Sequence, residues 1–244
     1  MKNFKIYAMG LAMAGALSFT SCADDYLDTA PTDAVSNVTI AQNMESLYLG
    51  LNGIHRQMIS QESGYQCMGG LGGMMYIMDI EADDITWITN TWMKAAYLGW
   101  QCNTNESNGY NTVFWRLYYQ WIMNANGLLE VLENTDVAAL SGSDKALYEQ
   151  IKGEALMFRA FSHFQAVQTY ADAYKAGGGN SQPGVPYRTV ANRNEGELAR
   201  STVEETYSLI NADLAEACSL LEGKKITELN HWSAKSAYAV RARV

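Results

Sequence analysis

The stretch that decides the fold is IKGEALMFRAFSHFQAVQTYADAY, residues 151–174. Its apolar side chains recur at steps of three and four residues, and they are Ile151, Ala155, Phe158, Phe161, Phe164, Val167 and Tyr170. This spacing places them on one face of an α-helix, which the pattern extends back to about residue 144. Glu154 and Arg159 lie among these apolar residues, and we expect them to form a structural polar contact that holds a helix pair.

The same spacing predicts four further helices. They cover residues 40–58, 115–132 and 203–221, and a last stretch that begins near residue 233 and still runs at residue 244. The sequence marks the start of the 203–221 helix. Ser201 with Glu204, or Thr202 with Glu205, can form a capping box. Two glycine-bearing stretches separate the helices: MGGLGGMMY (68–76) is interpreted as a flexible turn region, and residues 177–197 as an irregular excursion.

Amphipathic helices joined by short connections, at about 135–145 and 222–232, indicate a mainly α protein. We predict tetratricopeptide-like antiparallel helix pairs with irregular loop excursions. No strict repeat of about 34 residues is found. An ordinary helical bundle is therefore an alternative that the same apolar faces permit.

The composition limits the partners. The chain has 244 residues and a formal net charge of −9. An acidic surface repels phosphate backbones, so nucleic acid is not expected as a partner, whereas a neutral ligand meets no such penalty.

The N-terminal segment MKNFKIYAMGLAMAGALSFTSC (1–22) has two lysines, an apolar run and then small residues. This order is typical of a secretory signal peptide, which we assign to residues 1–21, and the run is short for a membrane span. A buried N-terminal helix is the alternative. Residues 22–38 then read as a tether, followed by a helical domain over residues 39–244.

Several local patterns coincide in chain order, and together they resemble the SusD/RagB family of nutrient-uptake outer-membrane lipoproteins. The stretches that carry the resemblance are SCADDYLDTAP, YLGLNGIHRQM, FWRLYYQWIMNANGLLE, IKGEALMFRAFSHFQAVQTYADAY, GVPYRT, STVEETYSLINADLAEA and SAKSAYAVRARV. GEALMFRAFSHF is the most family-specific of them.

The resemblance implies tetratricopeptide-like helix pairs with an irregular ligand-binding region on one side. It implies a protein at the cell outer membrane, facing the exterior, that captures an oligosaccharide or other nutrient and performs no chemistry on it. The implied partner is a SusC-like TonB-dependent transporter. Because family members are longer, it also implies that this chain is truncated at its C-terminal end, before a further helix pair.

Within this resemblance Cys22 is the expected lipidation site, because lipoprotein signals end in small residues before a cysteine and Thr20 and Ser21 fit. Phe19 departs from the usual smaller aliphatic residue. Acyl chains on Cys22, palmitate among them, would anchor the chain stably. Asp24 and Asp25 resemble the export signal that sends such lipoproteins to the outer face; simple solubility of the tether is the alternative.

The aromatic stretch DITWITNTWMKAAYLGWQCNTNES (84–107) supplies the glycan-binding candidates Trp87, Trp92, Tyr97 and Trp100. Indole and phenol rings stack on the C–H faces of sugars, and the neighbouring amides can bind hydroxyls. Family members place ligand-contacting aromatics in the corresponding region. Packing of these rings beneath the loop as a small core is the alternative.

No catalytic residue, metal site or cofactor is expected. The acidic stretch DIEADD (79–84) lacks the Gly and Glu of a calcium loop, and the three histidines are far apart in sequence and near no nucleophile. The cysteines form no Cys-x-x-Cys, although Cys67 and Cys102 could pair, and Cys218 reads as a small core residue. We therefore expect a binding protein and no enzyme; the alternative is a helical-repeat protein-interaction scaffold of a surface complex without sugar binding of its own.

Overall fold

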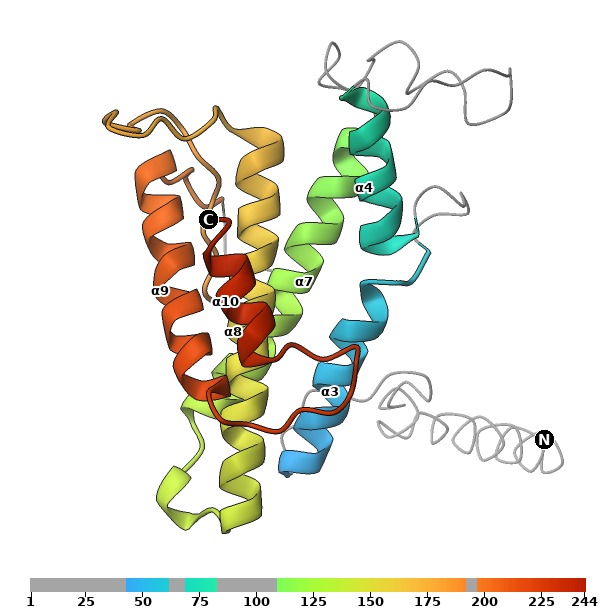
Figure 1. Cartoon of the computed structure of the whole chain (residues 1–244), viewed down its shortest axis with the longest axis vertical. Coiled ribbons are helices and arrows are strands. Elements are labelled where there is room, and N and C mark those ends of the chain that lie inside the picture. The colour runs from blue at the N-terminus through green and yellow to red at the C-terminus, as the bar shows by residue number, and fades with distance from the viewer. Residues whose placement is uncertain (1–42, 62–68, 83–108, 192–196) are drawn as a thin grey trace, which may run out of the picture. The chain divides into compact units, whose positions relative to one another are not determined.

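The computed structural model describes residues 43–61, 69–82, 109–191 and 197–244 (Figure 1). These ranges contain no β-strand, and their helices are α3 (Met44–Gln57), α4 (Gly70–Glu81), α7 (Gly109–Glu133), the short 3-10 helix η4 (Val137–Ala139), α8 (Gly142–Tyr170), α9 (Val203–Leu221) and α10 (Ala234–Arg241). The mainly α prediction is therefore confirmed for the described residues. None of the described helices is long and apolar enough to cross a bilayer.

Helix α8, formed by the stretch that the sequence singled out, is the centre of the packing. It contacts α9, α7 and α3. The successive helices α7, α8 and α9 alternate in direction, as Figure 1 shows, so each neighbouring pair is antiparallel. The connection between α9 and α10 reaches across to α3 before the chain turns back (Figure 1).

Large side chains fill the space between these helices. Trp121 and Tyr118 of α7 and Phe158 of α8 are fully buried. Removing a side chain of this size from water contributes roughly 1.5–3 kcal/mol to stability. The periodic apolar face of α8 therefore supplies much of the core that holds α7 and α9.

Gly153 sets the distance between α8 and α9. A Cβ atom at this position would lie 2.8 Å from Cγ of Leu221 and 2.9 Å from its Cδ2, closer than carbon atoms approach in proteins. Leu221, at the end of α9, is itself fully buried. The glycine thus allows the last turn of α9 to pack directly against the α8 backbone.

The prediction of a turn region over residues 68–76 is wrong, because Gly70–Glu81 form α4. Glycine has a low intrinsic helix propensity. Met74 and Ile77, three residues apart, are both buried, and the stability gained from their burial outweighs the cost of the glycines. Gly70 itself has a φ of 53°, and a Cβ there would overlap the carbonyl of Met58. It therefore permits the turn that leads into α4.

The irregular excursion between α8 and α9 is confirmed where the structure describes it, over residues 171–191 and 197–202. An isolated bridge joins Pro183 to Thr202, and the amide of Gly184 donates to the carbonyl of Ser201 at 2.7 Å. The predicted capping box is present in the Thr202 register: Thr202 accepts from the amide of Glu205, whose carboxylate accepts from the amide of Thr202. These contacts fix the excursion at the start of α9.

The prediction of a contact between Glu154 and Arg159 is wrong. Residues five apart on a helix point about 140° away from each other. Accordingly Arg159 pairs with Asp213 of α9, whereas Glu154 faces His55 of α3. Each residue still holds helices together, but with a partner from a different element.

Candidate functional site

A surface pocket of about 290 Å³ lies between α7 and the irregular excursion. Its lining residues are Trp115, Tyr119, Met123, Pro186, Arg188 and Leu198. The mixture of two aromatic rings, apolar side chains and one guanidinium group differs from the packed interior. It makes this pocket the candidate site among the described residues.

The aromatic wall comes from one face of α7. Trp115 and Tyr119 lie one helical turn apart, so their rings stand side by side with centroids 4.4 Å apart. Trp115 is 36% exposed, and its ring packs nearly perpendicular to the Tyr170 ring, with centroids 5.0 Å apart. The indole thus keeps an accessible surface although it is supported from beneath.

The opposite wall is the segment Val185–Val190, which hydrogen bonds hold against the helices. The hydroxyl of Tyr119 donates to the carbonyl of Pro186 at 2.8 Å. The side-chain amide of Asn126 donates to the carbonyls of Arg188 and Val190 at 3.1 and 3.3 Å. Helix α7 forms one wall, and hydrogen bonds from Tyr119 and Asn126 of the same helix hold the other. The pocket is therefore preorganised, and little ordering entropy is lost when it binds a ligand.

A buried polar network lies behind this wall. Arg159 holds Asp213 through two parallel hydrogen bonds of 2.7 Å, and the Tyr187 hydroxyl donates to the same carboxylate at 2.6 Å. The ring of Tyr187 stacks on His163 with centroids 3.9 Å apart. Burial raises the pKa of Tyr187, and the nearby Asp213 carboxylate raises it further. The hydroxyl therefore stays protonated and remains a hydrogen-bond donor. The network fixes the backbone that carries Pro186 and Arg188.

The pocket is suited to bind a ligand with apolar and hydroxyl surfaces. An accessible indole can stack on C–H groups, and a guanidinium donates several hydrogen bonds. Burial raises the pKa of Tyr119, whose hydroxyl is already committed to Pro186, so it remains neutral and is not positioned as a base. The arrangement favours binding over reaction.

The residues that the sequence predicted for binding, Trp87, Trp92, Tyr97 and Trp100, lie outside the described residues. So do Cys22, Asp24 and Asp25, and the cysteines Cys67 and Cys102. These assignments stay predictions. Cys218 is described, and it is a buried free thiol of α9, as expected.

Sequence reasoning missed the pocket. The three-four spacing over residues 115–132 places Trp115 on the apolar face of the helix with Tyr118, where an aromatic residue is expected to pack in the core, and it does not single out Tyr119. Helical spacing gives a weak signal, because Trp115 and Tyr119 lie between the buried Tyr118 and the exposed Arg116, at the edge of the apolar face. Arg188 lies in an irregular segment, where no periodicity indicates which side chains come together.

Comparison with known proteins gives the family. Residues 25–244 match the family model SusD-like, described as starch-binding associating with outer membrane. This match covers most of the chain, so the protein belongs to the SusD-like family, and the sequence resemblance is confirmed. No curated protein matches the chain.

Solved structures share the fold. A SusD-like carbohydrate binding protein from Bacteroides vulgatus ATCC 8482 superposes with a TM-score of 0.67 at 20% identity, covering 82% of this chain and 40% of that one. A SusD superfamily protein from Bacteroides thetaiotaomicron VPI-5482 gives a TM-score of 0.63 at 24% identity, with coverages of 82% and 42%. A laminarin binding SusD-like protein gives 0.62 at 20% identity, with coverages of 82% and 39%. The chain thus spans less than half the length of these structures.

Proposed function

We propose that this protein is a non-catalytic, surface-exposed lipoprotein that binds glycan and passes it to a SusC-like TonB-dependent outer-membrane transporter. The observation that carries the proposal is the family match over residues 25–244, together with its description as starch-binding associating with outer membrane. The laminarin-binding relative adds a glycan ligand within the same fold. The acidic chain, with a net charge of −9, favours a neutral glycan over a polyanion.

The pocket between α7 and the excursion is the proposed point of glycan contact among the described residues. A sugar ring would stack on Trp115, with Arg188 lining the same pocket. At about 290 Å³ the pocket is at the small end of ligand sites, so it suits a single sugar unit of a longer chain. The sequence-predicted aromatics of residues 84–107 would bind further units.

The anchor belongs to the same proposal. A signal peptide over residues 1–21, lipidation of Cys22 and the acidic pair Asp24 and Asp25 would place the protein on the exterior of the outer membrane. A surface location is where a protein that captures polysaccharide meets its ligand.

Native gel electrophoresis tests the proposal. The chain without its signal peptide is run in gels that contain starch, laminarin or another neutral polysaccharide. We expect retardation by at least one of these glycans, relative to a gel without polysaccharide. Failure to bind any of them, combined with binding to a SusC-like transporter, would contradict the sugar-binding role and favour the scaffold.

A further inference from the structure

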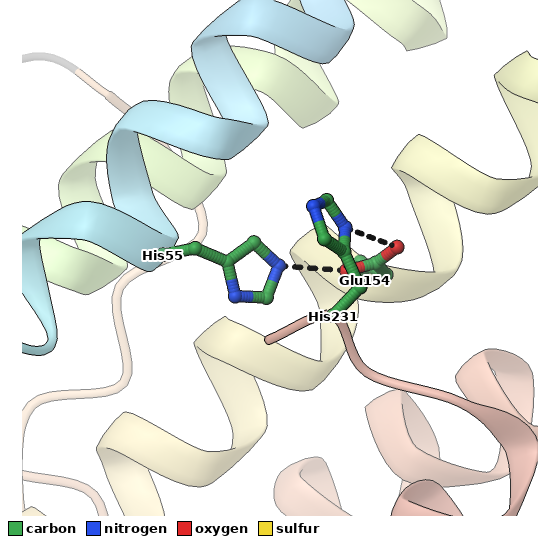
Figure 2. A group of neighbouring side chains, drawn as sticks. All are labelled: His55, Glu154 and His231. Carbon is green, nitrogen blue, oxygen red and sulfur yellow. Dashed lines mark hydrogen bonds and ion pairs between the residues drawn. The ribbon is translucent and has the colours of Figure 1, made fainter. Parts of the chain in front are cut away.

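Three side chains from distant parts of the sequence meet in the interior, on the side of α8 away from Arg159. Figure 2 shows His55 of α3 and His231 of the connection between α9 and α10 facing the Glu154 carboxylate of α8, and the two imidazole rings lie next to each other with centroids 4.3 Å apart. Nε2 of His55 lies 2.7 Å from Oε2 of Glu154, and Nδ1 of His231 lies 3.0 Å from the same oxygen. The three side chains are 4%, 0% and 2% exposed.

The geometry points to a binding site for a divalent transition metal, Zn²⁺ in particular, formed by His55, Glu154 and His231. One ligand atom from each of the three residues lies within 4.8 Å of the others. Two imidazole nitrogens and a carboxylate oxygen are a ligand set that Zn²⁺ uses, whereas Ca²⁺ and Mg²⁺ prefer oxygen ligands alone. Oε1 of Glu154 is also 3.0 Å from Nδ1 of His231, so the carboxylate presents both oxygens to the site.

The groups around the three ligands hold them in place. The side-chain amide of Gln150 donates to Oε1 of Glu154 at 2.9 Å, and the backbone amide of Trp232 donates to Oε2 at 3.1 Å. Outer donors of this kind orient the ligating carboxylate in metal sites. The His231 ring stacks on Tyr48 with centroids 5.3 Å apart, and the His55 ring meets Phe158 edge-on at 4.6 Å. The ligands are therefore restrained before a metal binds.

Charge balance favours a cation here. Two imidazole nitrogens, the Gln150 side-chain amide and the Trp232 backbone amide all face the Glu154 carboxylate, an arrangement that suits an ionised group. A buried carboxylate between two neutral imidazoles would leave one negative charge uncompensated, which is costly. Either a proton on an imidazole or a metal ion supplies the missing charge.

Metal binding would exchange protons for Zn²⁺ at defined atoms. Without metal, Nε2 of His55 and Nδ1 of His231 face carboxylate oxygens and carry protons. On binding, each nitrogen presents its lone pair to Zn²⁺. A neutral ring moves its proton to the other ring nitrogen, and a charged ring releases one proton to solvent. The metal would then cross-link α3, α8 and the connection before α10.

Zinc binding by the full chain tests this inference. After removal of metal with a chelator and dialysis against Zn²⁺, we expect about one tightly bound Zn²⁺ per chain. At a hundredfold excess over Kd, Zn²⁺ should raise Tm by about 5–10 °C. His231→Asn and His55→Gln should lose both effects. His163→Gln is the matched control, because it alters the one remaining histidine and should retain them.

Co²⁺ bound to the unaltered chain gives a second readout that needs no variant to fold. A tetrahedral nitrogen and oxygen site should give Co²⁺ the visible absorption of a four-coordinate ion, and Zn²⁺ should displace it. The inference is overturned if the unaltered chain retains no Zn²⁺ and gives no such absorption. It is also overturned if His231→Asn, shown to be folded by circular dichroism, binds Zn²⁺ as well as His163→Gln. Either result would identify the cluster as a structural contact between α3, α8 and the connection before α10.

Discussion

The backbone amide of Arg188 donates a hydrogen bond to Nε2 of His163 at 3.1 Å. Nδ1 of the same ring donates to the carbonyl of Arg159 at 2.8 Å. A ring nitrogen that accepts from an amide carries no proton, so His163 is neutral with its proton on Nδ1. This buried imidazole joins α8 to the segment that forms one wall of the pocket.

This neutral histidine predicts a loss of stability in acid. Burial lowers the pKa of His163 to about 3, and the Arg159 charge acts in the same direction. The unfolded chain takes up a proton near pH 6.5 while the folded chain does not, so stability falls as pH decreases from about 6.5 toward 3. The loss from this group reaches at most about 1.4 kcal/mol per pH unit.

Urea unfolding of the unaltered chain and His163→Gln at about pH 7 and pH 5 measures this contribution. The variant should be less stable at pH 7, because it disturbs two buried hydrogen bonds, but it should lose less stability between the two pH values. The Tyr187 and Tyr119 rings that flank His163 are the same in both proteins, so the difference isolates the imidazole. Equal losses in the two proteins would show that His163 accepts its proton in the folded state.

Breaking the buried Arg159–Asp213 pair should cost far more stability than breaking a similar exposed pair. Asp213→Asn leaves the Arg159 charge without its carboxylate at a site where the two side chains are 12% and 11% exposed. We expect it to reduce the free energy of unfolding by about 3–5 kcal/mol.

Glu216→Gln is the matched control for Asp213→Asn. The Lys152–Glu216 pair also joins α8 to α9, with a separation of 2.6 Å, but Glu216 is 49% exposed. Its loss should cost less than about 1 kcal/mol. Chemical denaturation of both variants gives the comparison, and similar costs would refute the claim that burial makes the Asp213 pair important.

Gly153 should tolerate no side chain without a cost. In Gly153→Ala the new methyl group would meet Leu221 at under 3 Å, so α9 must shift or Leu221 must change rotamer. We expect a loss of roughly 1–3 kcal/mol, although alanine is the better helix former. Gly142→Ala in the first turn of the same helix has open space around it and should be neutral or stabilising. Thermal unfolding of the two variants separates the effect of the contact with Leu221 from the effect of helix propensity. A gain in stability for Gly153→Ala would contradict the close approach of α9 to α8 at this position.

Local sequence patterns predicted the helices because their causes lie within a few residues. The Thr202–Glu205 capping box needs residues three apart, and the apolar face of α8 needs only a repeat of three and four. The turn assigned to residues 68–76 failed because burial of Met74 and Ile77 is a tertiary effect. The glycine content of the stretch alone could not indicate that these two side chains would be buried.

The sites depended on contacts between distant residues, which the sequence does not reveal. His55 and His231 lie 99 and 77 positions from Glu154, and they meet only because the connection between α9 and α10 reaches back to α3. Arg159 found its partner 54 positions away rather than on its own helix. The pocket likewise joins α7 to an irregular segment some 67 residues later.

Lipidation of Cys22 is tested in cells. Labelled palmitate should be incorporated into the unaltered chain and not into Cys22→Ala, because the acyl chains require this thiol. Cys218→Ala is a suitable control, since that thiol is buried in the folded domain. Equal labelling of Cys22→Ala and the unaltered chain would place the lipid elsewhere.

Glycan affinity of Trp115→Ala tests the central claim most directly. The exposed indole forms one wall of the pocket, and its removal should weaken binding of the retained glycan about tenfold or more, or at least 1.4 kcal/mol. Leu209→Ala is the matched control, because Leu209 is similarly exposed, at 41%, on α9 and outside the pocket. Isothermal titration with the glycan that retards the unaltered chain should give reduced affinity for Trp115→Ala and unchanged affinity for Leu209→Ala. Unchanged affinity in Trp115→Ala would contradict glycan binding at this pocket.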